Sequence, residues 1–457
     1  MSGFTMRELV EWNERIEACA QALGLDFYTQ EFEICSYEEM LGYEAYIGMP
    51  SHYPHWSYGK AFDRLHTLYR LNLTGLPYEM VINSNPCLAY LMRDNDLLLQ
   101  ILTMAHVYGH NDFFKQNRMF AHTQPELTVE MFKNHAERVR SYVQDPGIGY
   151  VKAERIIDAA HAIRYQTNRM PGAKRISGAE LKKRLMEDYQ NKCDAVRPDG
   201  LTGPVYPDPP DLTKVPLEPE EDLLLFILEH GKLDDWEQDL VRIVHAETEY
   251  FIPQIETKIL NEGWACFWHY RILEQLKLSP ELHMEFLTHH HQVIRPVLGG
   301  INPYHLGFTI LNDLEQRFGL AKVFEVREIE HDRSLIRRYL SRELCEALQL
   351  FEYGQERGHT AINEVADEHG WEKIRNTLST VVGMGSIPVI KVVEMLPRDQ
   401  TLVLEHEFDG RELDLGFAGE TLKYVVDLWG HPVRLKTNLD GNKTILCDEN
   451  KRLSTIE

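Results

Sequence analysis

Two histidines four residues apart, His106 and His110, are the clearest indication of chemistry in this sequence. On an α-helix, residues four apart lie on one face, so both imidazoles can reach a single ion. Imidazole nitrogen is a common ligand for zinc, iron and other first-row metals. The chain has 21 histidines, and two histidines packed in a helical core would show the same spacing. The pair predicts a metal site only if the chain supplies further ligands.

A second segment, NEGWACFWH, supplies candidates for those ligands. Glu262, Cys266 and His269 stand at positions i, i+4 and i+7, on one face of a helix. An H-x-x-x-H pair followed by a glutamate from a downstream E-G-W-A helix resembles the gluzincin type of metalloprotease. That resemblance implies His106, His110 and Glu262 as ligands of zinc, with iron or manganese as alternatives. Cys266 and His269 are then alternative ligands or supporting partners.

One position departs from the metalloprotease pattern. Val107 stands where those enzymes place the glutamate that activates a metal-bound water, and valine cannot accept a proton. The segment VKAERIIDAAHAI places Glu154, Asp158 and His161 on one helical face, so Glu154 or Asp158 could replace the base and His161 could add a ligand. Glu137 is a further supporting candidate. Equally, these carboxylates could lie on a solvated face, and the site could bind metal without hydrolysing a substrate.

The segment SHYPHWSYGK gathers four residues that could line a cleft above the helical site. They are His52, His55, Trp56 and Tyr58. The alternative is an aromatic cap on the core, which is the usual role of such clusters. The consecutive histidines at 289–291 point to three helical faces, so we expect no metal pair there.

The elements that must position these residues are mostly helical. Hydrophobic periodicity predicts helices at 5–24, 87–117, 126–145, 149–168, 220–230, 234–275 (divided or kinked at Pro253), 280–295, 308–317, 333–349 and 361–376. A strand is expected at 78–83. The last 75 or so residues contain short β-branched runs, PVIKVVEML, QTLVLEHEF, TLKYVVDLW, HPVRLKTNL and KTILCDEN, which predict strands. The fold class expected is α+β, with a zincin-like or helical-bundle core and a small C-terminal antiparallel β domain.

The length of 457 residues exceeds the roughly 250–300 residues at which a single core stops growing. We predict four segments along the chain. Residues 1–168 form a helical part that carries the H-x-x-x-H helix, and 169–220 form a proline-rich linker or arm. Residues 221–380 form a second helical part that carries the E-G-W-A helix, and 381–457 form the β domain.

Composition restricts the partners and the compartment. The formal net charge of −23 disfavours nucleic acid, whose phosphates are bound by Lys and Arg. No uncharged apolar run approaches the roughly 18–20 residues that span a bilayer. The N-terminus lacks a basic segment followed by an apolar one, and the seven cysteines form no C-x-x-C pair. These features predict reduced thiols and a cytoplasmic location.

Several long segments together resemble the stage V sporulation protein R (SpoVR) family. They are AHVYGHNDFFKQN, SHYPHWSYGKAFDRL, YEMVINSNPCLAYLM, NEGWACFWHYRI and INPYHLGFTILNDLE. The resemblance runs from about residue 5 to the C-terminal sheet. It implies a cytoplasmic protein that takes part in sporulation, in formation of the spore cortex peptidoglycan, and a connection with a PrkA-type kinase system. It implies no particular reaction.

Three functional hypotheses follow. The first is a regulatory or assembly factor for cortex formation, which docks protein partners through the proline-rich arm or the C-terminal sheet and carries a metal site. The second is a metal-dependent hydrolase with a gluzincin-like site, an amide substrate and a relocated general base. The third is a purely structural network of buried His–Glu pairs, since buried charges must be paired.

Overall fold

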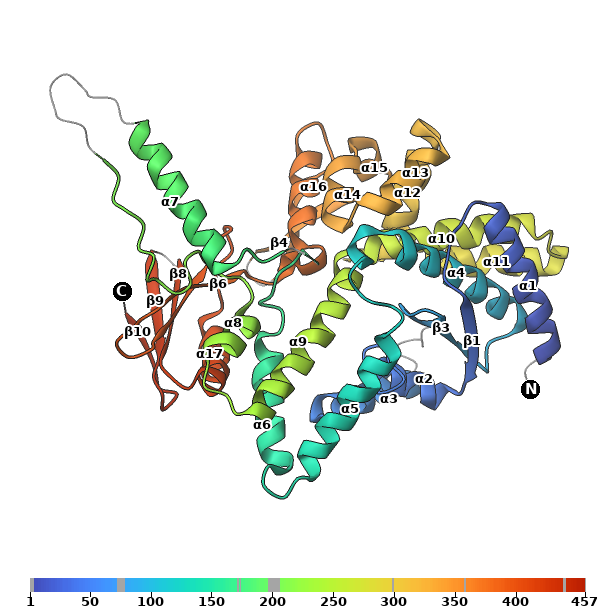
Figure 1. The fold of residues 1–457 in the computed structure, drawn as a ribbon. Helices are drawn as coiled ribbons and strands as arrows, with labels where there is room; N and C mark the ends of the chain where they lie inside the picture. The colour runs from blue at the N-terminus through green and yellow to red at the C-terminus, as the bar shows by residue number, and fades with distance from the viewer. Residues whose placement is uncertain are drawn as a thin grey trace. The chain divides into compact units, whose positions relative to one another are not determined.

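The structure is a computed structural model, which describes residues 4–71, 79–170, 172, 174–195, 206–297, 300–356, 359–438 and 441–456. These residues form seventeen α-helices and ten strands (Figure 1), so the predicted helix-dominated α+β class is confirmed. The chain divides into two compact units, and each is discontinuous in sequence. The first unit comprises residues 1–144 and 249–386, and the second comprises 145–248 and 387–457. The predicted four-segment division remains a prediction.

The first unit contains most of the helices and a small sheet. Its helices are α1 (Met6–Ala22), α2 (Tyr37–Ala45), α3 (Trp56–Arg70), α4 (Leu97–Gln116), α5 (Thr128–Gln144), α10 (Lys258–Gln275), α11 (Pro280–Val293), α12 (Pro303–Phe318), α13 (Leu320–Ile329), α14 (Asp332–Tyr339), α15 (Arg342–Ala347) and α16 (Gly370–Val381). Strands β1 (Gln30–Cys35), β2 (Glu79–Ile82) and β3 (Cys87–Met92) form a sheet in the order β1-β3-β2. Strand β3 pairs in parallel with β1 and antiparallel with β2. A separate hairpin joins β4 (Phe351–Glu356) to β5 (His359–Val365).

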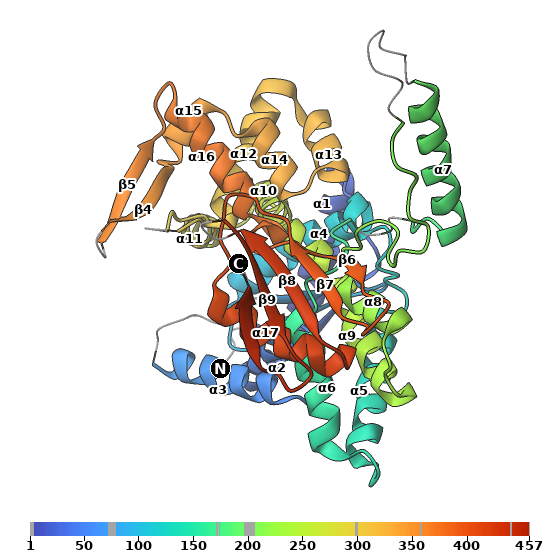
Figure 2. The same cartoon turned by 90° about the vertical axis from the view of Figure 1, so that its left-hand side faces the viewer.

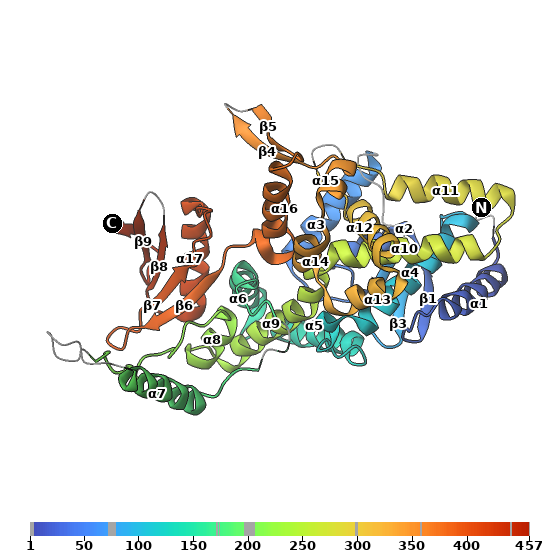
Figure 3. The same cartoon turned by 90° about the horizontal axis from the view of Figure 1, so that it is seen from above.

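Helix α4 lies at the centre of the first unit, beside α10 (Figure 3). Asp96 caps its N-terminus by accepting a hydrogen bond from the backbone N–H of Leu99 at 2.7 Å. Every residue from Leu98 to Phe114 is buried. A helix that is surrounded on all faces lies inside a core, so His106 and His110 are held in the interior and not on a solvated surface.

Glycines allow the central helices to approach backbone to backbone. A Cβ built on Gly109 of α4 would lie 2.7 Å from the Cα of Ala265 in α10. A Cβ built on Gly263 of α10 would lie 2.4 Å from the Cα of Gly307 in α12. No side chain fits at such distances, so these glycines set how closely α4, α10 and α12 pack. Gly109 precedes His110 and Gly263 follows Glu262, so the close contacts fix the positions of the candidate ligands.

The start of α10 is fixed by a residue from another helix. The carboxylate of Asp332, in α14, accepts hydrogen bonds from the backbone N–H groups of Ile259 and Leu260, at 2.8 and 2.9 Å. Thr257, the N-cap residue of α10, makes no side-chain cap, so Asp332 provides the acceptor that an N-terminus needs. Burial raises the pKa of Asp332 to about 8, although the two N–H donors oppose the change.

A buried ion pair ties α4 to α13. The guanidinium Nη1 of Arg327 donates to both carboxylate oxygens of Asp112, each at 2.8 Å, and the indole N–H of Trp264 donates to the same carboxylate at 3.0 Å. Both charged residues are buried. The pair therefore links three core helices close to the histidines of α4.

The second unit contains a five-stranded sheet and four complete helices. The helices are α6 (Gly149–Ile163), α7 (Gly178–Asp194), α8 (Leu223–His230) and α17 (Leu415–Trp429), and α9 (Asp235–Glu256) continues from this unit into the first. The strands are β6 (Ile390–Met395), β7 (Leu402–His406), β8 (Val433–Asn438), β9 (Asn442–Cys447) and β10 (Leu453–Ile456). Their order is β10-β9-β8-β7-β6, and α17 contacts β8 and β9 (Figure 2). Three of the four pairings are antiparallel; β7 and β8 are parallel and are joined through α17.

Three local predictions were wrong. The helix expected from residue 87 begins only at Leu97, because 87–92 form the central strand of the small sheet. The helix expected at 361–376 is strand β5 followed by α16. The run TLKYVVDLW, expected as a strand, is the second half of α17. Asp414 caps this helix. Leu422, Val425, Val426 and Trp429 are buried at the 3.6-residue spacing of a helix, and the β-branched residues among them gave the segment the composition of a strand.

Two further observations concern predictions about the chain as a whole. Within the predicted arm, α7 occupies residues 178–194 and has no buried side chain. Pro253 lies inside α9, and the chain separates into α9 and α10 at Thr257. Across the described ranges, no helix combines the length and the apolar composition that crossing a membrane would require.

Candidate metal centre

Three predicted ligands converge between α4 and α10. The Nε2 atoms of His106 and His110 lie 3.6 and 3.4 Å from the Oε2 atom of Glu262. Both histidines lie on one face of α4, as the spacing predicted, and the centroids of their rings are 4.7 Å apart. Glu262 comes from the first turns of α10. The structure therefore places two imidazole nitrogens and one carboxylate oxygen around a common point.

These separations match those of a zinc site. Zinc bonds to histidine and carboxylate are about 2.0–2.2 Å long, so a tetrahedral ion places its ligand atoms about 3.3–3.6 Å apart. The observed 3.4 and 3.6 Å between the glutamate oxygen and the histidine nitrogens fall in that range. Direct hydrogen bonds would instead bring the atoms to about 2.7–3.2 Å. The spacing therefore favours an ion between the side chains over direct hydrogen bonds between them.

Two of the converging atoms are buried without a hydrogen-bond partner. Among the residues described, nothing forms a hydrogen bond with the Nε2 atom of His106 or the Oε2 atom of Glu262. An unsatisfied buried polar atom costs roughly 1–3 kcal/mol, so native proteins seldom leave two side by side. A bound cation would satisfy both atoms.

A fourth donor, Glu79, comes from strand β2. Its Oε1 atom lies 3.8 Å from the Nε2 atom of His106, and Glu79, His106 and His110 form a group of donors within metal-binding range. Sequence reasoning missed this residue. The strand itself was expected at 78–83, but which helix a strand residue faces depends on tertiary packing, and a glutamate in a strand carries no local sign of it.

The charges of the site interact strongly. Burial alone would raise the pKa of Glu262, but the imidazoles of His106 and His110 outweigh burial and hold the pKa of Glu262 well below its usual range. Burial disfavours a charged His110, yet the carboxylate of Glu262 raises the pKa of His110 above its usual value. Burial raises the pKa of Glu79, and the imidazoles offset only part of this effect. The charge of Glu262, together with burial, raises the pKa of the Tyr304 phenol well above its usual value.

The other nitrogen of each histidine is also held. The Nδ1 atom of His110 lies 2.8 Å from the amide oxygen of Asn261, which can only accept, so this nitrogen donates and Nε2 is left free for an ion. The Nδ1 atom of His106 lies 2.9 Å from the Nδ1 atom of His269, and the Nε2 atom of His269 lies 2.8 Å from the Nδ1 atom of His290.

An ion bound to His106 would fix which nitrogen donates in each hydrogen bond of the chain His106–His269–His290. An ion on the Nε2 atom of His106 requires that its Nδ1 atom carries the proton and donates to His269. His269 then donates to His290 through Nε2. Burial and neighbouring histidines lower the pKa of His269 well below its usual value and that of His290 to about 4. Both rings are therefore neutral, and each can donate a hydrogen bond through one nitrogen and accept one through the other. Residues 289–291 are predicted to form no metal pair; one of them, His290, is buried and completes this chain of hydrogen bonds.

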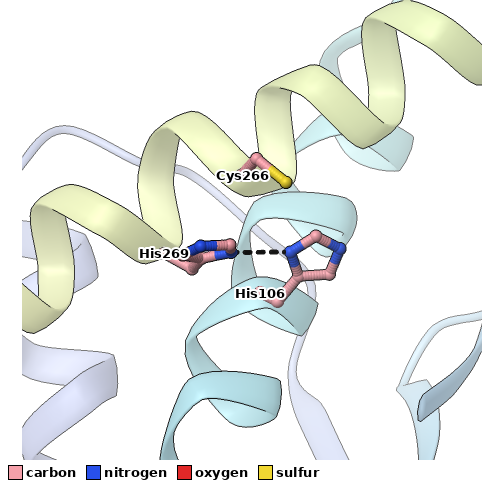
Figure 4. Close-up of side chains that lie close together, drawn as sticks. All are labelled: His106, Cys266 and His269. Atoms are coloured by element: carbon pink, nitrogen blue, oxygen red, sulfur yellow. Dashed lines mark hydrogen bonds between the residues drawn. The ribbon is translucent and has the colours of Figure 1, made fainter. Parts of the chain in front are cut away.

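His106 also belongs to a second group of donors, with Cys266 and His269 (Figure 4). His106 comes from α4 and the other two from α10, as the close-up shows. This group fits an ion less well, because the nitrogens of His106 and His269 are already bonded to each other and His269 is also bonded to His290. Burial, reinforced by Glu262 and Glu79, raises the pKa of the Cys266 thiol well above its usual value, so without a metal it is a neutral thiol.

The predicted substitutes for the general base lie elsewhere in the chain. Glu154, Asp158 and His161 are half-buried residues of α6, in the second unit, whereas the ligands belong to the first. The carboxylate of Glu154 accepts a hydrogen bond from the phenol of Tyr150. Glu137 is exposed on α5 and is not in the donor groups that form around His106 in the described residues. The role of these four residues stays a prediction.

The predicted cleft residues pack against other aromatic rings. His52 accepts a hydrogen bond from the backbone N–H of Tyr53, and its Nε2 atom lies 3.2 Å from the hydroxyl of Tyr58. His55 caps α3 by accepting a hydrogen bond from the backbone N–H of Ser57. Trp56 is 49% exposed, whereas His52, His55 and Tyr58 are buried. These contacts are typical of an aromatic cap, and a role in lining a cleft stays a prediction.

Comparisons with known proteins bear on this geometry. Residues 3–387 match the family described as SpoVR like protein, and residues 388–440 match the SpoVR-like C-terminal domain. The chain belongs to the SpoVR family. A relative from Escherichia coli (strain K12), named "Uncharacterized protein YcgB", is 33% identical to this chain, and the alignment covers 94% of this chain and 92% of YcgB. No solved structure is significantly similar to the chain. The family model thus covers all four converging donors, whereas the relative's name gives no activity.

Proposed function

We propose that this SpoVR protein binds one divalent transition-metal ion through His106, His110 and Glu262, and that it uses the ion to hydrolyse an amide bond. The observation that carries the proposal is the pair of buried unpartnered atoms, Nε2 of His106 and Oε2 of Glu262, at tetrahedral spacing. Charge supports it as well. Two carboxylates, Glu79 and Glu262, share an interior site, and buried charges need counter-charges. The two positive charges of a divalent cation would balance the two carboxylates.

Zinc is the ion that the donors favour. Two imidazole nitrogens and a carboxylate oxygen form the ligand set of a zinc site that keeps its fourth position open. Iron and manganese accept the same donors and are the alternatives. Such an ion, when bound, would polarise a carbonyl oxygen and activate water. The ring centroid of Tyr304 lies 6.2 Å from that of His106, and we propose that its phenol donates to an oxygen that gains negative charge.

Metal content tests the ligand assignment. Protein purified without chelators, and then dialysed against zinc, should contain stoichiometric zinc by inductively coupled plasma mass spectrometry. His106→Ala, His110→Ala and Glu262→Gln should lose it. His122→Ala is the matched control, because His122 is exposed and should not matter. Wild-type protein that takes up no zinc, or ligand variants that keep it, would contradict the proposal.

The reaction is tested separately from the ion. The resemblance to the SpoVR family suggests peptidoglycan as the source of the amide, so the probe is a mixture of soluble muropeptides incubated with zinc-loaded protein. Mass spectrometry should detect a product heavier by one water, or the two fragments with a new amine and a new carboxylate. Metal-free protein should give neither.

A non-catalytic role is the second candidate, and Val107 is the observation that favours it. This residue is fully buried at the position where a metalloprotease carries its base. A protein that binds stoichiometric zinc but hydrolyses no muropeptide would support a regulatory or assembly factor. In either case we propose a part in spore cortex formation, together with a PrkA-type kinase system. Complementation of a spore-forming bacterium that lacks its own SpoVR protein, with wild type and Glu262→Gln, would test that part.

A further inference from the structure

Glu79 occupies the place from which a proton acceptor for this site would act. The proposed ligands come from two helices, and the residue after His106 is valine, so the helix that carries the histidines supplies no base. Resting on the proposed metal function, we propose that Glu79 takes the proton of the water that attacks the substrate carbonyl. The base is then carried by strand β2, and not by α4 or α6.

The strand directs Glu79 to the site by its alternation. Side chains of a β-strand point to opposite faces in turn, so Glu79 and Val81 share one face of β2, and Met80 and Ile82 share the other. Val81 packs against the core cluster that contains the α4 residues. Met80 and Ile82 belong to a different cluster. The face that carries Glu79 is therefore the face turned towards α4.

Glu79 lies beside the proposed ligands. Its Oε1 atom lies 3.8 Å from the Nε2 atom of His106, against 3.6 Å for the Oε2 atom of Glu262, and it forms a donor group with both histidines. If His106, His110 and Glu262 hold the ion, a carboxylate at this distance would lie within reach of a water beside the ion. A general base must be within hydrogen-bond distance of the proton that it takes.

The two glutamates are nearer to solvent than the two histidines. The side chains of Glu79 and Glu262 are 15% and 17% exposed, whereas those of His106 and His110 are 4% and 7% exposed. We therefore place the entry of a substrate and a water on the side of the glutamates.

The proposed step balances as follows. One O–H bond of water breaks, its proton moves to Oε1 of Glu79, and the electron pair of that bond stays on oxygen. The oxygen forms a bond to the amide carbonyl carbon, and the π electron pair of the C=O bond moves to the carbonyl oxygen. That pair then re-forms the C=O bond while the C–N bond breaks with its electron pair on nitrogen, and nitrogen takes the proton from Glu79. The products are a carboxylic acid and an amine, and Glu79 returns to its initial state.

Acetohydroxamic acid provides a test that needs no substrate. This compound chelates a metal ion as its anion, and in a hydrolytic site the displaced proton goes to the base. Wild-type protein loaded with Co(II) should bind acetohydroxamic acid, as seen by a change in its visible spectrum. Glu79→Gln should keep stoichiometric Co(II) but bind acetohydroxamic acid about 10- to 100-fold more weakly, as expected for loss of a hydrogen bond to a charged group.

Two controls make the result specific. Azide has no proton to give, so its affinity should not be weakened in Glu79→Gln. Glu33→Gln removes an exposed carboxylate from β1 of the same sheet and should behave as wild type. Glu79→Ala provides a second variant, and circular dichroism should show that both Glu79 variants are folded.

Three other outcomes would contradict either the role of Glu79 or the metal function itself. If Glu79→Gln binds acetohydroxamic acid as tightly as wild type, Glu79 is not the proton acceptor, and the metal centre stands. If both Glu79 variants are folded but lose Co(II), Glu79 is a ligand and the inference is wrong. If the wild type takes up no Co(II), the metal function itself fails, and the inference fails with it.

Discussion

Gly263 should be essential for the proposed metal centre, although glycine has no side chain that could bind a metal. It follows Glu262 in α10 and packs against the backbone of Gly307 in α12. A Cβ at position 263 would lie 2.4 Å from both the Cα and the carbonyl carbon of Gly307, and 2.8 Å from the backbone nitrogen of Phe308. The obstructing atoms belong to the backbone, so no rotamer change can relieve the contact.

The size of the effect follows from these distances. Ordinary carbon contacts begin at about 3.5 Å, so Gly263→Ala must separate α10 from α12 by about 1 Å. Overpacking of a core costs about 1–3 kcal/mol, and replacing glycine by alanine in a helix returns about 1 kcal/mol at most. Because the clash is with backbone atoms that cannot move aside, we take the upper end of the overpacking cost, about 3 kcal/mol. The expected net loss of unfolding free energy is then about 2 kcal/mol. Since metal sites tolerate errors of only about 0.2 Å in ligand distance, zinc affinity should fall by roughly the 10- to 100-fold seen for supporting residues.

Urea unfolding followed by circular dichroism measures the stability of the metal-free protein, and competition with a chromophoric chelator measures zinc affinity. Gly42→Ala in α2 is the matched control, because a Cβ there would meet no atom within 4 Å. It should stabilise the protein by about 0.5–1 kcal/mol and leave zinc affinity unchanged. Gly263→Ala with wild-type stability and wild-type zinc affinity would refute the packing argument.

Three further predictions follow from the described contacts. His269→Phe removes the partner of the His106 Nδ1 atom and should weaken zinc binding about 10- to 100-fold in chelator competition; an unchanged affinity would count against the histidine chain. Because the pKa of His290 is about 4 when folded, against its ordinary value of 6.5, only the unfolded chain gains a proton between these values. The unfolding free energy of the metal-free protein should therefore fall by up to about 3 kcal/mol as the pH drops from about 6.5 to 4. In urea titrations, His290→Asn should reduce this dependence of unfolding free energy on pH. An unchanged dependence in His290→Asn would contradict the assignment. Asp112→Ala leaves Arg327 buried without its partner and should cost about 3–5 kcal/mol in urea unfolding, whereas a loss below about 1 kcal/mol would mean that the pair is replaceable.

Helical spacing predicted the part of the site that lies on two helices. His106 and His110 share a face because they are four residues apart, and the E-G-W-A segment indicated Glu262. These are local properties of sequence, and the structure brings the three side chains together. Cys266 and His269, on the same face of α10 as Glu262, also lie near His106.

The remaining parts of the site depend on contacts between distant segments. Glu79 reaches the site because β2 pairs with β3 and turns one face to α4. Asp332 caps a helix that begins more than 70 residues earlier in the chain. Neither role leaves a pattern in the local sequence. In α17, composition alone predicted the wrong secondary structure. Its β-branched residues are typical of a strand, but its buried positions follow the spacing of a helix.

The most direct test of the metal centre is a crystal structure of the zinc-loaded protein with anomalous data at the zinc edge. We predict a single anomalous peak about 2.0–2.2 Å from the Nε2 atoms of His106 and His110 and from a carboxylate oxygen of Glu262, with Glu79 outside the ligand set. A peak bound instead to the Cys266 sulfur at about 2.3 Å, or no peak between α4 and α10 at stoichiometric zinc, would contradict the account.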